Sequence, residues 1–313
     1  MKNGVISGLT RRRFLALSAG ALCGASSVAA ASRPVTRWQG TALGADASAQ
    51  LVGLDPASAS DILVGLQREL RRLETLFSLY RPESQVSRLN REGRLDAPAP
   101  ELLEVLAQCD ALHRGTGGAF DPTTQPLFAT FAQAAAAGRT PSGDEVARAR
   151  AAVGWHHLRI GTDSVAFARP GGQLTLNGIA QGYISDRIAA WLRDRGLTDI
   201  LLEAGEIVAL GHGPDATPWR CRIADAAGTS RRELRLRDRA IATSAPDAMT
   251  LAGARHIFDP ASGRSADRGR MTSVSAPAAM LADGLSTALC VLPPESHATV
   301  IARFPGARVE FAT

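Results

Sequence analysis

The sequence predicts an α+β protein with a single large domain, in which mixed, mainly antiparallel sheets pack against helices. Three observations favour this fold class. Two stretches, 158–168 and 220–236, read as antiparallel strands joined by a turn. Several longer stretches repeat apolar residues at helical spacing. With 45% hydrophobic residues, no internal repeat and no evident linker, residues 32–313 are expected to fold as one domain.

Residues 1–31 are predicted to be a Tat export signal. A twin-arginine pair, Arg11–Arg12, precedes a modest apolar run, and small residues ending at Ala31 provide a cleavage site. A transmembrane anchor is the alternative, but no apolar run reaches the roughly 18 residues that a membrane span needs. Leu22 is too large to precede a lipidated cysteine at Cys23, so lipidation is not expected. We therefore expect a periplasmic protein without a membrane span in the mature chain.

Charge and residue content exclude several classes of function. The formal net charge is +5, but the leader holds 4 of the 35 basic residues and no acid, which leaves 31 basic against 30 acidic residues. This near balance gives no indication of a nucleic-acid partner. Lys2 is the only lysine, so the mature chain has no P-loop lysine, Schiff base or Ser–Lys dyad. The motifs GxSxG, HExxH and GxGxxG are also absent.

The mature chain is expected to begin with strands and a long helix. Residues 37–53 read as strands with a glycine turn near Gly44, and residues 58–77 place apolar side chains on one helical face. Pro82 and several Ser and Asn residues make 76–90 irregular. A ligand contact is expected in that loop, with a plain surface loop as the alternative.

A second helix is predicted at 100–114, and a glycine-rich segment follows it. The glycines would let the backbone approach a ligand, and Phe120 with Asp121 could stack on a ring and hydrogen-bond to it. Residues 132–138 either continue a helix or form a connection, and 141–153 read as another helix.

Residues 174–196 form the centre of the second half. Leu174 and Leu176 alternate with polar neighbours like a short strand, a turn containing Gly178 follows, and apolar residues then recur at helical spacing until Gly196. A helix that opens after such a turn favours an anion, and a phosphate is the expected one. The alternative is a turn that only packs a helix on a sheet.

After a buried strand predicted at 199–211 and interrupted at 204–206, a helix is predicted at 281–292. It places Asp283 and Thr287 four residues apart on one side. A carboxylate and a hydroxyl one turn apart suit Mg²⁺, although helix-dipole and local hydrogen-bonding roles are the alternative. Together with the glycine turn, this helix predicts Mg²⁺-assisted chemistry on a pyrophosphate.

Taken in order, these segments resemble the ApbE family, the FAD:protein FMN transferases, over nearly the whole mature chain. The matching pieces are LFSLYRPESQVSRLN, GGAFDPTTQPL, LNGIAQGY, EAGEIVALG, IATS, HIFDPASG and LADGLSTAL. The resemblance implies an ApbE-like, T-fold-like architecture. It also implies Mg²⁺-dependent transfer of FMN from FAD, the substrate, to a threonine or serine hydroxyl of an acceptor protein through a phosphoester bond, with release of AMP.

The acceptor implied by the resemblance is a flavin-accepting protein of a membrane respiratory or electron-transfer complex. Two alternatives remain open on the residues alone. In an FAD pyrophosphatase, water would replace the acceptor hydroxyl, and an exported carrier would bind flavin without catalysis.

The resemblance assigns functional residues as well. The catalytic positions would be His256, beside the reacting phosphate, and Asp283. The metal ligands would be Gly178 through its backbone carbonyl, Asp283, Thr287 and the neighbouring Ser286. FAD would contact Leu43, Tyr80, Ala119, Phe120, Asp121, Thr175, Gln181 and Ile257. The family often has an acid at Thr175, a lysine or glutamate at Gln181, and GD at Gly205–Glu206, so the strength of FAD binding is left open.

Overall fold

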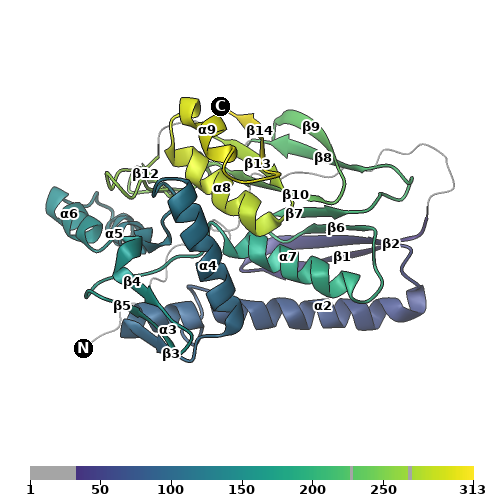
Figure 1. Cartoon of the computed structure of the whole chain (residues 1–313), viewed down its shortest axis with the longest axis horizontal. Helices are drawn as coiled ribbons and strands as arrows, with labels where there is room; N and C mark the ends of the chain where they lie inside the picture. Colours follow the sequence, from purple (N-terminus) through teal and green to yellow (C-terminus); the bar gives the residue numbers. More distant parts are fainter. Residues whose placement is uncertain (1–32, 226–227, 267–269) are drawn as a thin grey trace.

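The computed structural model describes residues 33–225, 228–266 and 270–313, so the predicted export signal lies outside the described residues. One antiparallel sheet organises the fold (Figure 1). Its strands lie in the order β1 (Val35–Ala42), β2 (Ala45–Val52), β6 (Ile200–Glu203), β7 (Ile207–Leu210), β10 (Arg239–Ser244), β13 (Thr272–Ala276) and β14 (Arg308–Ala312), each antiparallel to its neighbours. The expected fold class, α+β with mainly antiparallel sheets, is confirmed.

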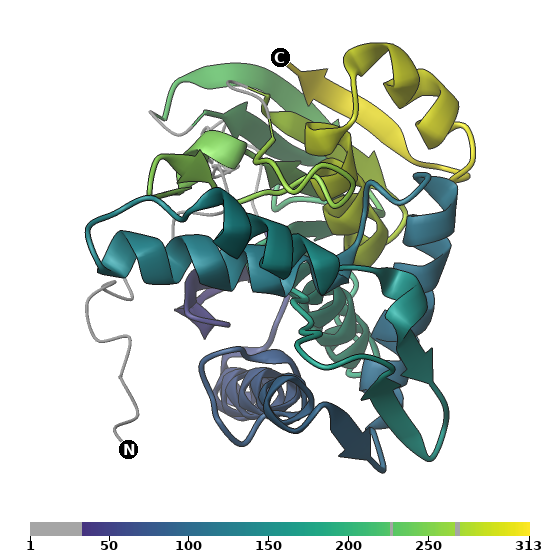
Figure 2. The same cartoon turned by 90° about the vertical axis from the view of Figure 1, so that its left-hand side faces the viewer.

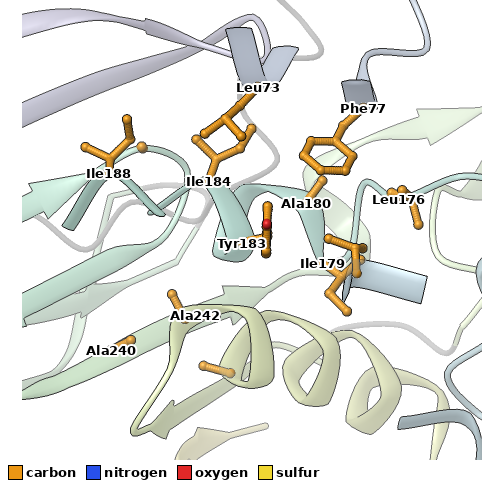
Figure 3. Packing of buried hydrophobic residues seen from close by; sticks show 14 of the residues in the cluster. Leu73, Phe77, Leu176, Ile179, Ala180, Tyr183, Ile184, Ile188, Ala240 and Ala242 are labelled. Carbon is orange, nitrogen blue, oxygen red and sulfur yellow. The ribbon is translucent and has the colours of Figure 1, made fainter. Parts of the chain in front are cut away.

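Helices α7 (Ala180–Arg193) and α8 (Ala279–Val291) cover one face of this sheet, and the long helix α2 (Pro56–Phe77) packs against α7 (Figures 1 and 2). Figure 3 shows how the side chains interlock. Phe77 meets the fully buried Tyr183 edge to face, with ring centroids 5.5 Å apart. Burying one such side chain stabilises the fold by about 2 to 3 kcal/mol, so these contacts hold α7 firmly in place.

The other face of the sheet is covered by a two-stranded sheet of β8 (Trp219–Ala224) and β9 (Ser230–Leu236). The central strands therefore bury side chains on both faces. In β7, Val208 and Leu210 belong to the helix-side core, whereas Ile207 and Ala209 belong to the core under the β8–β9 sheet. Because both faces are covered, all four side chains of this strand are buried.

The remaining elements surround this centre. The helices are α3 (Gln85–Glu92), α4 (Pro100–Gly115), α5 (Gln125–Ala136), α6 (Gly143–Ala151) and α9 (Pro294–Ile301), with short 3-10 turns η1 (Pro122–Thr124), η2 (Trp155–His157) and η3 (Pro246–Ala248). One small sheet has the strand order β3 (Arg94–Asp96), β5 (Ser164–Phe167) and β4 (Leu158–Ile160). Another pairs β11 (Thr250–Leu251) with β12 (Ala254–Arg255). In the part of the chain that the structure describes, no helix is both long and apolar enough to cross a membrane.

Three sequence predictions of local structure were wrong. The segment 174–176 is not a strand, because Asn90 bonds both the N–H and the C=O of Leu174, at 2.6 and 2.8 Å, and Thr175 donates its N–H to Pro122. The segment 76–90 is not irregular throughout, since Ser84 caps the start of α3. The segment 199–211 is a hairpin of β6 and β7 rather than one interrupted strand.

Candidate functional site

A narrow cavity of about 110 Å³ lies where the start of α7, one side of α8, strand β10 and the segments 119–128 and 256–258 meet. The structure brings most of the predicted site residues to its wall. Those that line it are Ala119, Phe120, Asp121, Thr175, Gly178, Gln181, His256, Ile257, Asp283 and Thr287. Segments separated by more than a hundred residues in the sequence therefore form one wall.

The glycine turn and the late helix touch directly. A Cβ atom added to Gly178 would lie 2.8 Å from Thr287 Oγ1, so only glycine allows the two segments to come this close. One turn further along, a Cβ on Gly182 would lie 2.4 Å from the backbone oxygen of Ala279. The backbone of α7 thus lies against the first turn of α8, as a shared metal site would require.

Two carboxylates, one buried and one half-buried, tie these helices together in opposite directions. Asp283 on α8 accepts the backbone N–H of Gly182 at 3.1 Å, and Asp186 on α7 accepts the N–H groups of Ala279 and Met280 at 2.7 and 2.9 Å. Ala278, the residue before α8, has no side chain that could cap it, so Asp186 caps the helix from outside. The anion that the structure places at the start of α7 is the carboxylate of Asp283.

The base of the cavity holds two carboxylates, and no arginine or lysine of the described residues lines the cavity. Asp283 and Glu206 are both buried, at 3% and 6% exposure. Burial, followed by the neighbouring charge of Asp186, raises the pKa of Asp283 to about 7. Burial and the charge of Asp283 raise the pKa of Glu206 well above its usual value. A cation placed here would relieve both effects.

Hydroxyl groups complete this oxygen-rich wall. Ser244 Oγ on β10 lies 2.7 Å from Ser286 Oγ and 3.3 Å from Thr287 Oγ1, so Ser286 sits behind the cavity wall rather than on it. Among the described residues, no group of three or more His, Cys, Asp and Glu side chains could hold a metal by itself. A cation would take hydroxyl, carbonyl, water and substrate oxygens besides carboxylate, which fits Mg²⁺ and does not fit Zn²⁺.

Two of the predicted FAD contacts lie away from this cavity. Leu43, at the β1–β2 turn, has φ of +49° and donates its N–H to Glu74 of α2 at 2.8 Å. Tyr80 follows α2 and is 61% exposed. Neither residue lines the cavity. A ligand that reached from Asp283 to Tyr80 would therefore extend beyond the cavity over the surface of the protein.

The comparison with known proteins agrees with this geometry. A model of the ApbE family matches residues 43–311, which is most of the chain. The chain belongs to the ApbE family. Its relatives include the FAD:protein FMN transferase of Vibrio cholerae serotype O1, which is 30% identical over 250 residues, 75% of each chain.

Solved structures of ApbE proteins share the fold. A mutant of the flavin transferase ApbE from Vibrio cholerae matches with a TM-score of 0.78 and 26% identity, covering 90% of this chain and 97% of that one. The apo form of the flavinyl transferase ApbE from Pseudomonas stutzeri matches with a TM-score of 0.73 and 28% identity, covering 86% and 88%. The likeness thus covers most of each chain.

His256 is neutral in this ApbE-family chain. Its Nδ1 lies 3.1 Å from the backbone oxygen of Pro246, which can only accept, so Nδ1 carries the proton and Nε2 keeps its lone pair. Burial lowers the pKa of His256 to about 4. Above pH 5 its Nε2 can therefore accept a hydrogen bond from a hydroxyl in the cavity.

Asp121 has a different role in the structure from the ring contact that the sequence suggested. One of its oxygens accepts the N–H and the hydroxyl of Thr123, at 2.8 and 2.6 Å, and the other accepts the N–H of Trp155 at 3.2 Å. These bonds fix the segment that carries Ala119 and Phe120. Asp121 therefore supports the cavity wall through these hydrogen bonds, and it also lines the cavity.

The sequence analysis did not assign site roles to Glu206 or Ser244, which also line the cavity. A signal was present for both. Glu206 is a carboxylate in the turn between two apolar strand segments, and Ser244 follows Thr243 at the end of strand β10. The other lining residues are Pro122, Thr124, Gln125, Phe128, Asn177, Thr243, Phe258 and Val291.

Proposed function

We propose that this chain transfers FMN from FAD to a threonine or serine hydroxyl of an acceptor protein, in a Mg²⁺-dependent reaction that forms a phosphoester bond and releases AMP. The relatives in the family are FAD:protein FMN transferases. The observation that carries the proposal is the contact of the Gly178 turn with α8, which gathers the carboxylate of Asp283 and the hydroxyl of Thr287 in one cavity.

The residues of the chain can be given roles in this reaction. Asp283, Thr287 and the carbonyl of Gly178 would hold Mg²⁺, with Ser286 and Ser244 supporting the orientation of Thr287. When bound, Mg²⁺ would neutralise charge that develops on the pyrophosphate oxygens. Ala119, Phe120, Thr175, Gln181 and Ile257 would hold FAD against this wall. His256 Nε2 would accept the hydrogen bond of the acceptor hydroxyl, orient it and ease its proton away.

Intact-mass measurement tests the proposal directly. The mature protein is incubated with FAD, Mg²⁺ and a candidate flavin-accepting subunit, while AMP release is followed. The expected result is an acceptor heavier by one FMN group, with one AMP released per adduct and neither product formed by the Asp283→Ala variant. Release of AMP and free FMN without an adduct would instead identify an FAD pyrophosphatase. If FAD is not converted at all, the protein is a flavin-binding carrier.

We also propose that the protein works in the periplasm on an acceptor of a membrane respiratory or electron-transfer complex. The support for the periplasmic location is the Arg11–Arg12 pair and the small residues up to Ala31. The support for the acceptor is the family resemblance alone. Replacing both arginines by lysine is expected to leave the folded precursor in the cytoplasm, detected by cell fractionation. Export of that variant at the wild-type level would contradict a Tat route, because only that route requires the twin arginines.

A further inference from the structure

The segment that leads into the glycine turn, residues 174–178, alternates like a strand but has no strand partner among the described residues. Leu174 and Leu176 belong to the helix-side core, at 0% and 1% exposure, and Figure 3 shows Leu176 in that core. Thr175 and Asn177 line the cavity instead. A contact other than a β-sheet ladder therefore decides which side chains of this segment face the cavity.

The register of this segment matters for the site. In an extended chain, a shift by one residue exchanges the two faces, so apolar side chains would turn toward the cavity and Thr175 would turn into the core. The proposed function needs Thr175 beside FAD and the carbonyl of Gly178 beside the cation. Both requirements depend on the same register, because the two residues are only three positions apart.

One side chain provides the contacts that a strand partner would provide. Asn90 Oδ1 accepts the N–H of Leu174 at 2.6 Å, and Asn90 Nδ2 donates to the carbonyl oxygen of Leu174 at 2.8 Å. Two residues that face each other in an antiparallel sheet exchange hydrogen bonds in the same way. Thr175 donates its own N–H to the carbonyl oxygen of Pro122 at 2.8 Å, so neighbouring residues of the segment are bound to two different elements.

Asn90 lies on a helix that is itself firmly held. Helix α3 packs against the long helix α2 and against β3 (Figure 1). Its Val86 and Leu89 side chains are fully buried. At the start of α3, the hydroxyl of Ser84 donates to the carbonyl oxygen of Ser78, directly after α2. These contacts fix Asn90 relative to the core, so the position of Leu174 is fixed as well.

We propose that Asn90 is a positioning residue for the transfer reaction. It takes the role of a strand neighbour, fixes the register of residues 174–178, and so places Thr175 for FAD and the carbonyl of Gly178 for Mg²⁺. The proposal rests on the transferase function proposed above. Asn90 is not one of the residues that line the cavity, so it acts through the backbone of the segment and not by contact with a ligand.

Two substitutions separate hydrogen bonding from shape. Asn90→Ala removes both hydrogen bonds, whereas Asn90→Asp keeps the shape but replaces the donor with an oxygen that repels the Leu174 carbonyl. Each is expected to raise the Mg²⁺ concentration for half-maximal AMP release from FAD about tenfold, because backbone groups lose their partner and the segment shifts. Hydrogen exchange of the ligand-free protein, followed by mass spectrometry, should become faster at 174–178 in both variants.

Gln85→Ala is the matched control on the same helix. Gln85 is also a half-buried amide of α3, and its Oε1 accepts the N–H of Ala99 at 2.9 Å, away from the cavity. The variant should lower the midpoint of urea unfolding, as the Asn90 variants should, because it also leaves a backbone donor without its partner. It should keep the Mg²⁺ dependence of the wild type and show faster exchange near Ala99, not at 174–178.

The outcomes separate positioning from stability and from the reaction itself. A wild-type Mg²⁺ dependence in the Asn90 variants, even with faster exchange at 174–178, would limit Asn90 to a structural role and overturn the proposal. An equal rise in the Mg²⁺ requirement of Gln85→Ala would also overturn it, since any loss of stability would then have the same effect. Both results would leave the transferase function standing. If the wild type releases no AMP from FAD, the transferase function fails, and the positioning role fails with it.

Discussion

At the scale of single residues, the site depends on the absence of a side chain at one position and on an unusual histidine. Gly178 permits the contact with Thr287, and the burial of His256 keeps its ring neutral. Both properties arise from neighbours far away in the sequence. Each one leads to a measurement on a single substitution.

Gly178→Ala is expected to lower transfer at least tenfold and the free energy of unfolding by about 1 to 3 kcal/mol. The new Cβ would stand 2.8 Å from Thr287 Oγ1, so the hydroxyl must move. Gly143→Ala is the control, because nothing lies within 4 Å of a Cβ at that helix start. If the Gly178 variant keeps both its rate and its Mg²⁺ dependence, the two segments do not act on one ion.

His256→Ala is expected to lower the rate of transfer by about 10² to 10⁴. Because the pKa of His256 lies near 4, its ring is unprotonated across the neutral range and becomes charged only as the pH falls through 4. The wild-type rate should therefore show no acid-side loss from this group between pH 5 and 8. A loss centred near pH 6.5 that is absent in the Ala variant would contradict this assignment.

At the scale of elements, the relation of α7 to α8 determines the cavity. The two helices come from distant parts of the chain, yet Asp186 bonds the first turn of α8 and Asp283 bonds the first turn of α7. Each carboxylate satisfies N–H groups that a helix start leaves free. The two carboxylates together fix the position of α8 relative to α7, and so hold Thr287 against Gly178.

Asp186→Ala should therefore cost about 1 to 3 kcal/mol in the free energy of unfolding, because two backbone donors at the start of α8 lose their partner. It should also raise the Mg²⁺ concentration needed for half-maximal rate, since α8 carries Asp283. Urea unfolding and a Mg²⁺ titration measure the two effects, and Asp186→Asn should restore part of each. A loss of stability at unchanged Mg²⁺ dependence would limit Asp186 to a structural role.

At the scale of the whole molecule, folding brings two carboxylates into a buried position where neither has a positive partner among the described residues. Asp283 and Glu206 both carry raised pKa values for this reason. Such an arrangement costs stability whenever both groups are ionised. A bound cation offsets that cost, which connects the fold to the proposed chemistry.

Mg²⁺ at about a hundred times its dissociation constant should then stabilise the native state by roughly 2.7 kcal/mol and raise the midpoint of thermal unfolding by several degrees. EDTA should remove this increase. In Asp283→Ala the midpoint should not respond to Mg²⁺ at all. An equal response in wild type and variant would place the cation elsewhere in the protein.

Local patterns predicted many of the elements. Apolar periodicity located α2, α4 and α8, and the turn at Gly44 located the β1–β2 hairpin, because each depends on residues close in sequence. The same reasoning failed at Leu174, whose backbone bonds Asn90 instead of a strand. A side chain 84 positions away decided that segment, and periodicity carries no information about such partners.

By itself, the sequence determined the fold class and the family resemblance, since these depend on residue types and short spacings, and it predicted the residues that would hold metal and FAD. Only the tertiary structure decided that Glu206 and Ser244 join Asp283 at one cavity, and that Leu43 and Tyr80 lie outside it. The physical reason is the distance along the sequence over which each interaction acts. Helix and turn signals act over a few residues, whereas a cavity is made by packing elements that come from both halves of the chain.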